Sequence, residues 1–369
     1  LDDEVLDDHL APDLRERLRF AWIRLAPLLP GGEYVGMETA PVEPWPHQWF
    51  AARRLIETYP DSHLLCDEVG LGKTIEAGLA FRSLWLCGAA RSIRVFAPAS
   101  LTVQWLFEMS EKFLLAFRRR TSRDGHYETS NLLTGEVTSG FSTPFSEPLE
   151  IYSTGLIVHD RSRRFLEPMP DTDLVLVDEA HKARRHQPDQ TGRLPVFNRL
   201  YRALDDQIFP KARALLLATA TPMQLNPDEA FDLIQFMPGA GGVRCVPELG
   251  QLLYLIRDSL LDQDDLGSER VRFLRRYLQD VRKHAPAQWQ FVMERVLSDH
   301  DRLDLELFLD YGTQPMEWQF LQPALSMLMP LGRVMLRQTR GLLREYERDG
   351  RLSARLAQRD VQPAIVGLE

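Results

Sequence analysis

The chain has 369 residues, of which 44% are hydrophobic and 26% are charged, and its formal net charge is −9. These values are ordinary for a folded globular protein with one large domain or two smaller ones, and they exclude a uniformly basic nucleic-acid binder. No apolar run approaches the ~20 residues that a membrane-spanning helix needs, so we expect no membrane partner.

The N-terminal 42 residues are predicted to be a helical lead-in to the first domain. Within this lead-in, the segment LRERLRFAWIRLAPLL at 14–29 has the apolar spacing of an amphipathic helix. We expect that helix to bury one face.

Strands and helices then alternate along the chain. The apolar run HLLC at 63–66 predicts a strand, and 74–87 predicts a largely buried helix that ends at Gly88. A second strand is expected at 94–100. It leads into an amphipathic helix at 101–117, whose large apolar side chains recur every four residues.

Three further apolar runs predict strands, at 149–154, 173–180 and 214–221. Each run is continuous rather than alternating, which is typical of a parallel sheet covered on both faces. Strands of this kind alternating with helices predict an α/β fold with a doubly wound, mostly parallel sheet over residues 43–238. Residues 118–148, rich in Ser, Thr and Gly, are expected to form a long surface connection.

The pattern becomes helical from residue 239. Residues 239–345 are predicted to form an α-helical insertion without strands, either packing over the first domain or engaging a partner protein or a nucleic-acid duplex. The segments with helical spacing are 249–262, 271–281, 287–297 and 316–346. Aromatic side chains occur there in i, i+2 pairs, which cannot share one helical face, so we expect them in the core; they are Trp289, Phe291, Trp318 and Phe320.

The cysteines indicate the cellular compartment. Cys66, Cys87 and Cys245 lie far apart, and no two of them form a CxxC pair. This spacing argues against a disulfide framework and against a zinc site. Free thiols are typical of a reducing compartment, so the sequence predicts a cytoplasmic protein.

The stretch DEVGLGKT at 67–74 has the features of a phosphate-binding loop. Gly70 and Gly72 allow the backbone amides to turn towards an anion, and the following helix directs the positive end of its dipole to the same point. Lys73 is expected to neutralise phosphate charge, and the Thr74 hydroxyl is expected to ligate magnesium. The motif thus predicts binding of ATP with magnesium.

The stretch DEAH at 178–181 follows a buried strand. Asp178 is expected to hold the magnesium ion, and Glu179 to orient and deprotonate the attacking water. In open α/β sheets, ligands bind at the carboxyl ends of the strands. We therefore expect the glycine loop, the DEAH box and the TAT triplet at 219–221 to share one edge of the sheet.

Together these motifs resemble helicase superfamily 2, specifically the RapA-like ATPases of its Swi/Snf branch. In that branch the phosphate loop reads D-E-x-G-L-G-K-T, which accounts for Asp67 where a stricter loop has glycine. The resemblance implies that residues 43–238 are a first RecA-like ATPase lobe. It also implies a set of nucleotide-binding residues, namely Gln48, Asp67, Gly70, Leu71, Gly72, Lys73, Thr74 and Ile75.

The resemblance implies further roles outside the nucleotide pocket. It marks His181, Thr219 and Thr221 as residues that couple the γ-phosphate state to the grip on nucleic acid. It also implies a set of nucleic-acid contacts, namely Ser100, Gln104, Ser153, Arg163 and Arg164. Basic runs at 112–123 and 161–164 flank these segments, and we expect them to contact the phosphate backbone rather than to be merely solvated.

Motors of this family close two RecA-like lobes on one ATP, and the second lobe supplies arginine fingers. Residues 346–369 resemble a linker and the start of that second lobe, whose later motifs are missing here. Arg184 and Arg340 are not expected to replace these arginine fingers, because the resemblance assigns other roles to the stretches in which they lie. An arginine finger is worth ~10³ to 10⁵ in turnover, so we expect this chain alone to bind ATP weakly and to be nearly inactive in hydrolysis.

Two functions remain open at this point. The first is an ATP-driven translocase on double-stranded DNA that remodels protein–DNA complexes, either in RNA polymerase recycling or in anti-phage defence. The second is a nucleotide-dependent interaction scaffold without motor activity, which would dock partners through the helical insertion. An RNA helicase is disfavoured, because GLGKTIEAG and TATPMQL resemble the Swi/Snf branch instead.

Overall fold

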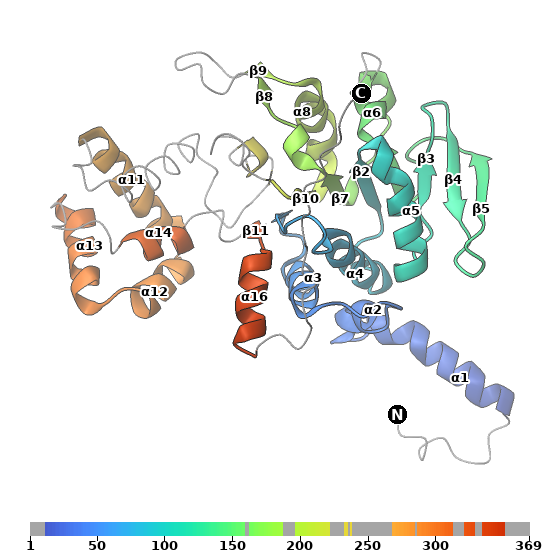
Figure 1. Cartoon of the computed structure of the whole chain (residues 1–369), viewed down its shortest axis with the longest axis horizontal. Coiled ribbons are helices and arrows are strands. Elements are labelled where there is room, and N and C mark those ends of the chain that lie inside the picture. The colour runs from blue at the N-terminus through green and yellow to red at the C-terminus, as the bar shows by residue number, and fades with distance from the viewer. Residues whose placement is uncertain are drawn as a thin grey trace, which may run out of the picture.

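The computed structural model describes residues 12–158, 162–186, 196–221, 232–234, 237, 268–284, 286–312, 321–328 and 334–350. Its centre is a nine-stranded sheet with helices on both faces, as the sequence predicts (Figure 1). No helix among these residues combines the length and the apolar composition needed to cross a bilayer.

The sheet has the strand order β11-β1-β10-β7-β2-β6-β3-β4-β5. Neighbours from β11 to β3 pair in parallel, whereas β4 and β5 add antiparallel strands at one edge. The strands are β1 (His63–Leu65), β2 (Ile93–Ala97), β3 (Arg118–Arg120), β4 (His126–Ser130), β5 (Val137–Phe141), β6 (Leu149–Ser153), β7 (Thr172–Asp178), β10 (Ala212–Ala218) and β11 (Met335–Leu336). A separate two-stranded ribbon pairs β8 (Arg185–His186) with β9 (Val196–Phe197).

Each face of the sheet has its own apolar core, because side chains alternate along a strand. In β7, Val175 and Val177 join one core, while Leu174 and Leu176 join the other. Helices α3 (Pro46–Thr58), α4 (Lys73–Leu86) and α5 (Ala99–Phe113) cover the second face. On the first face lie the short helices α6 (Thr154–Ile157), α7 (Ser162–Leu166) and α8 (Arg199–Ala203).

Helix α5 is shorter than the periodicity predicts. It ends at Phe113, and Leu114 follows in the left-handed conformation with φ of 52°. The chain can then turn back to the sheet, where Phe117 is fully buried just before β3. The apolar spacing beyond 113 therefore reflects burial in a connection rather than another helical turn.

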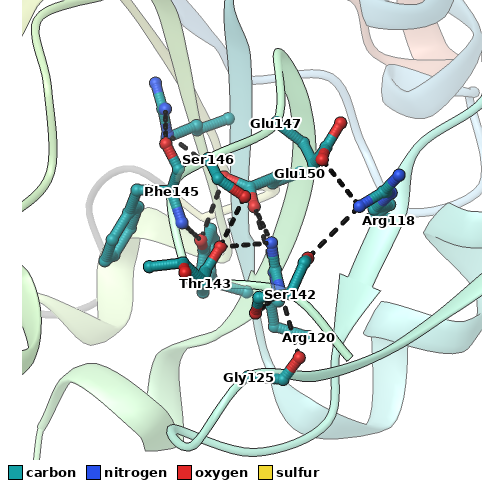
Figure 2. A network of polar contacts seen from close by, with 11 residues as sticks. Arg118, Arg120, Gly125, Ser142, Thr143, Phe145, Ser146, Glu147 and Glu150 are labelled. Atoms are coloured by element: carbon teal, nitrogen blue, oxygen red, sulfur yellow. Dashed lines mark hydrogen bonds and ion pairs between the residues drawn. The ribbon is translucent and has the colours of Figure 1, made fainter. Parts of the chain in front are cut away.

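The long surface connection expected at 118–148 is wrong. These residues form β3, β4 and β5, and they extend the sheet beyond β6. Figure 2 shows the polar network that holds them, in which Arg120 Nε donates to Glu150 Oε1 at 3.0 Å. Its other nitrogens donate to the main-chain carbonyls of Gly125, before β4, and of Ser142 and Thr143, after β5. Arg120 and Glu150 have fully buried side chains, so this ion pair fixes the extension to the central sheet.

The expected burial of the N-terminal amphipathic helix is also wrong. Helix α1 (Pro12–Leu25) forms, but it projects from the rest of the molecule in Figure 1. Its large apolar side chains are exposed, and the fraction reaches 67% at Phe20 and 63% at Ile23. The short helix α2 (Val35–Glu38), in contrast, packs on α4.

The predicted insertion is helical in its described parts. It contains α11 (Ser268–His284), α12 (Pro286–Arg295), α13 (Asp299–Tyr311) and α14 (Leu321–Leu328), grouped to one side of the sheet in Figure 1. The segment 249–262 lies outside the described residues. Trp289 is partly buried as expected, but Phe291 is 52% exposed, so the core prediction is wrong for it; Trp318 and Phe320 lie outside the described residues.

The continuous helix expected at 316–346 is interrupted. Strand β11 joins the sheet beside β1, and a new helix, α16 (Arg340–Arg348), begins after it. The expectation of no strand after residue 239 is therefore wrong. A two-residue strand is too short to leave a periodic signal, and its partner in the sheet is about 270 residues away in the sequence.

Candidate nucleotide-binding site

The phosphate loop connects β1 to α4, and two glycines shape it. Gly70 and Gly72 have φ of 83° and 93°, a region that residues with a Cβ adopt at a cost of ~1 to 2 kcal/mol. At Gly72 an added Cβ would also lie 2.3 Å from the side-chain nitrogen of Gln48. Both positions therefore need glycine, as the motif predicts.

A cavity of about 300 Å³ opens beside this loop. The elements that line it are the loop, the first turn of α4, one side of α5, the carboxyl end of β7 and Ala220 after β10. The lining residues that can hydrogen-bond or carry charge through their side chains are Lys73, Thr74, Gln104, Trp105, Glu108, Lys112, Asp178 and Glu179. Main-chain donors, two lysines and three carboxylates thus meet in one space, which suits a polyphosphate with a cation.

Strand register brings the acids to the loop. Ala218 of β10 pairs with Asp178 of β7 on one side and with Leu65 of β1 on the other. The three motif-bearing strands therefore end at the same level, and the expected shared edge is confirmed. Thr219 N donates to Leu65 O at 2.8 Å and continues the pairing one residue further.

Asp178 is held in place by two donors. Trp105 Nε1 donates to its Oδ2 at 2.9 Å, and the main-chain N–H of Glu179 donates to its Oδ1 at 2.8 Å. Burial raises the pKa of Asp178, whereas these hydrogen bonds and the charge of Lys73 act in the opposite direction. A bound cation would favour the ionised form further, so the geometry suits a metal-associated carboxylate.

Glu179 has a strained backbone. Its φ of 52° and ψ of 44° lie in the left-handed region, which is uncommon for a residue with a side chain. Strain of this kind persists when the surroundings impose it, and it clusters at functional sites. Here the turn sends the chain away from the sheet into a short helical turn at 180–182 while Glu179 still lines the cavity.

The three residues predicted to couple the pocket to nucleic acid are linked by hydrogen bonds. His181 Nδ1 lies 3.0 Å from Thr219 Oγ1 and 3.2 Å from Glu179 Oε2. Thr219 Oγ1 also accepts from the main-chain N–H of Thr221 at 3.1 Å. A chain of polar contacts therefore leads from the DEAH box to the end of β10, although its coupling role stays a prediction.

Asp67 is almost fully buried, and the two oxygens of its carboxylate differ in their surroundings. Oδ1 accepts from Gln338 N at 2.7 Å, whereas Oδ2 accepts no hydrogen bond from the described residues. Burial and the nearby Asp67 raise the pKa of Glu76 well above its usual range, which favours the neutral form of Glu76. A neutral carboxyl group can donate to Asp67, and this removes one of two adjacent buried charges.

Metal ligands could come from two places in the described chain. His47, Asp67 and Glu76 have ligand atoms within 4.8 Å of one another, and all three side chains are buried. Thr74 and Asp178, in contrast, face the open cavity. They offer the oxygen ligands that magnesium prefers, so they suit the predicted ion.

Gln48 lies in the first turn of α3, and its amide group is engaged within the protein. Its Oε1 accepts from Trp45 N at 2.9 Å as a helix cap, and its Nε2 donates to Leu71 O at 2.8 Å. Gln48 is therefore buried and supports the phosphate loop directly. Contact with adenine stays a prediction, as do the nucleotide contacts of Leu71 and Ile75.

The predicted nucleic-acid contacts differ in their exposure. Ser100 and Arg164 are exposed, Ser153 is half-buried, and the side chain of Arg163 lies outside what the structure describes. Gln104 lines the nucleotide cavity and donates to Glu108 at 2.7 Å. Their roles stay predictions, and Gln104 is placed for the nucleotide pocket.

Three consecutive arginines of the basic run at 112–123 have acidic partners. Arg118 pairs with Glu147 at 2.7 Å and Arg119 with Glu128 at 2.6 Å, while Arg120 is buried against Glu150. The prediction that this run contacts nucleic acid is wrong for Arg120. The charges of its two neighbours are likewise balanced within the sheet extension.

Some residues at the site escaped the sequence analysis. The indole of Trp105 was expected only as a core side chain, yet it orients Asp178. Arg340 and Gln338 reach the phosphate loop from the far end of the described chain. The repeat of apolar residues in α5 does not indicate that Trp105 also makes a polar contact. The contacts of Gln338 and Arg340 with the phosphate loop join residues far apart in the sequence, so no local pattern predicts them.

Comparisons with known proteins find relatives of this chain among bacterial helicases and RapA proteins. No protein-family model matches it. It is 31% identical over 198 residues to the uncharacterised ATP-dependent helicase YqhH of Bacillus subtilis, which covers 53% of this chain and 30% of that protein. It is 30% identical over 275 residues to the RNA polymerase-associated protein RapA of Klebsiella pneumoniae, which covers 69% of this chain and 26% of that protein.

Among solved structures, the SWI2/SNF2 ATPase core of Sulfolobus solfataricus in complex with double-stranded DNA aligns with a TM-score of 0.42 at 14% identity. That alignment covers 84% of this chain and 66% of the other. The chain spans less than a third of the length of the two curated relatives described above. By its sequence, the chain is homologous to RapA proteins and to the helicase YqhH.

Proposed function

We propose that this chain is the ATP-binding half of a nucleic-acid-dependent motor ATPase. One observation carries the proposal: the phosphate loop and both DEAH carboxylates line the same cavity of about 300 Å³. The cavity also receives the amino end of α4, where free main-chain N–H groups favour an anion.

The residues of the cavity divide the work of ATP hydrolysis. Lys73 neutralises phosphate charge, and Thr74 with Asp178 would hold magnesium, which supplies electrostatic stabilisation of the transferred phosphoryl group. Trp105 fixes the orientation of Asp178 through its hydrogen bond. Glu179 is the candidate for orienting water, because its carboxylate shares the cavity and contacts His181 rather than an arginine or lysine.

Nucleotide-binding measurements with two variants test this assignment. Lys73→Ala should weaken binding of a fluorescent ATP analogue in the presence of magnesium by at least about tenfold, because it removes a charge-assisted contact. Glu179→Gln should bind the analogue as the wild type does. Lys182→Ala, which removes an exposed lysine beside the DEAH box, is the control. Unchanged affinity in Lys73→Ala would contradict the role assigned to Lys73 and the proposed ATP site with it.

The motor substrate we propose is double-stranded DNA, and the process is remodelling of protein–DNA complexes. The relative RapA is named for its association with RNA polymerase, which makes polymerase recycling the first setting to test and anti-phage defence the second. Duplex DNA should stimulate ATP hydrolysis by the longest natural form of the protein more than single-stranded DNA or RNA does. Stronger stimulation by RNA would contradict the choice of substrate.

Efficient hydrolysis is proposed to need a second lobe. The described residues that line the cavity include lysines but no arginine, which supports the expectation that residues 1–369 alone turn over slowly. We retain the proposed division into a lead-in at 1–42, a lobe at 43–238, an insertion at 239–345 and a linker at 346–369. A cytoplasmic location is part of the proposal, supported by the unpaired thiols of Cys66 and Cys87.

A further inference from the structure

The segment 335–348, made of β11 and α16, lies directly against the phosphate loop. Strand β11 lies at the edge of the sheet, and Figure 1 shows α16 next to it, near the C-terminal end of the colour scale. Three kinds of contact join this segment to residues 66–71: main-chain hydrogen bonds, an arginine contact and an apolar contact. Each kind involves a different part of the segment.

The main-chain contacts continue the pairing of β1 with β11 into the loop. Beyond the paired strands, Cys66 N donates to Leu336 O at 2.7 Å and Glu68 N donates to Gln338 O at 3.2 Å. Between them, the buried carboxylate of Asp67 accepts from Gln338 N at 2.7 Å. The first residues of the phosphate loop are therefore bonded on one side to the C-terminal segment.

The arginine contact lies at the first turn of α16. Arg340 Nη2 donates to Val69 O at 3.3 Å, and its Nε lies 3.9 Å from a Glu68 carboxylate oxygen. The same guanidinium group lies over Gly70, where an added Cβ would be 3.2 Å from Nη2. Arg340 thus spans the outer side of the loop at the residues before Leu71.

The apolar contact lies one turn further along the helix. Leu71 and Leu343 are 4% and 0% exposed, and they form a small core of their own that Tyr346 partly covers. Leu71 is also the residue whose carbonyl oxygen accepts from Gln48. The loop is therefore fixed between α3 on one side and α16 on the other, and Lys73 follows two residues later.

We propose that the segment 335–348 is a positioning element of the phosphate loop, with Arg340 and Leu343 as its positioning residues. This inference rests on the proposed nucleotide-binding function. A loop that binds phosphate through its main-chain amides must be held in one conformation before the ligand arrives, since ordering it upon binding would cost affinity. The segment supplies that order from outside the pocket, without touching the nucleotide itself.

The proposal gives this segment a role in communication between parts of the motor. Residue 350 is the last that the structure describes, and the chain continues from α16 towards the predicted linker. Any displacement of α16 changes the support of Val69 and Leu71, and therefore the affinity of the loop for phosphate. Nucleotide binding must shift the position of α16 in return, because the coupling between two sites is reciprocal.

The test uses the 369-residue chain and the variants Arg340→Ala, Arg340→Lys and Leu343→Ala. Arg344→Ala is the matched control, because Arg344 is an exposed arginine on the same helix. Affinity for a fluorescent ATP analogue with magnesium should fall roughly five- to tenfold in Arg340→Ala, and Arg340→Lys should recover part of the loss. Amide hydrogen exchange at residues 67–72 should rise in Arg340→Ala and Leu343→Ala, with thermal stability unchanged in Arg340→Ala.

Lys73→Ala separates the two hypotheses. If Lys73→Ala loses affinity while Arg340→Ala and Leu343→Ala bind like Arg344→Ala with unchanged exchange in the loop, the positioning role is refuted and nucleotide binding stands. If Lys73→Ala binds as the wild type does, the proposed function fails first. A loss of affinity in Arg340→Ala with exchange raised throughout the chain would show general destabilisation and would also overturn the proposal.

Discussion

Individual residues at this site are shaped by contacts that their neighbours impose. Glu179 adopts a left-handed backbone conformation, and Asp178 is fixed by an indole N–H from α5. Neither feature follows from the DEAH motif itself. The motif predicts which chemical groups the site contains, whereas the conformations of Asp178 and Glu179 depend on the surrounding strands and helices.

His63, at the start of β1, predicts a pH dependence of stability. Burial lowers the pKa of His63 from 6.5 to about 4, so the folded protein keeps the ring neutral while the unfolded chain takes up a proton below pH 6.5. Stability should therefore fall as the pH drops from about 6.5 to about 4. The contribution of this group approaches about 3 kcal/mol at the lower end.

Urea unfolding of the wild type and of His63→Gln from pH 7 to pH 4 measures that contribution. The variant should lose less stability over this interval, by up to about 3 kcal/mol. His126→Gln is the control, since the His126 side chain is 62% exposed. Parallel pH profiles for the wild type and His63→Gln would show that His63 is hydrated.

The buried central strands of the sheet could be predicted from the sequence, whereas the strands β3, β4 and β5 at one edge of the sheet could not. Strands β7 and β10 contain the continuous apolar runs LVLV and ALLLA, which predict central strands. The sequences of β3, β4 and β5 are RRR, HYETS and VTSGF, which have little apolar character. Their strand structure depends on pairing with β6 and on Arg120, and no local pattern reports such a partner.

The residues that line the candidate site could be predicted from the sequence, but the residues that support it from outside could not. The residue types of the loop and the DEAH box predict one pocket, because parallel strands end at a common edge. Gln338 and Arg340, which support the pocket from outside, lie in the segment 316–346 that was predicted to be one continuous helix. Their approach to Asp67 and Val69 depends on β11 joining the sheet, which tertiary packing decides.

The ion pair that fixes the sheet extension predicts a large effect of one substitution. Arg120→Met leaves the Glu150 carboxylate buried with less compensation and should lower the free energy of unfolding by about 3 kcal/mol. Arg118→Met breaks a pair in which both side chains are about 30% exposed and should cost less than about 1 kcal/mol. Urea unfolding compares the two, and equal losses would contradict the assigned role of Arg120.

At the scale of the whole molecule, α1 contributes little to the fold. Its apolar side chains are exposed, and its contacts are with the residues that follow it at 26–28. Removing residues 1–25 should therefore change the free energy of unfolding by less than about 0.5 kcal/mol. Thermal unfolding of residues 26–369 beside the whole chain measures this, and a marked loss of stability in the shorter protein would show that α1 is covered.

The support of the phosphate loop by Gln338 also has a consequence for biosynthesis. The two partners Asp67 and Gln338 are separated by 271 residues, so the ribosome must make most of the chain before the loop can receive its outer contacts. Closing a contact over such a distance is among the slower events in folding. A nascent chain that has emerged only to the end of β10 should therefore carry the complete glycine motif and both DEAH acids, yet acquire its nucleotide affinity only after α16 has left the exit tunnel.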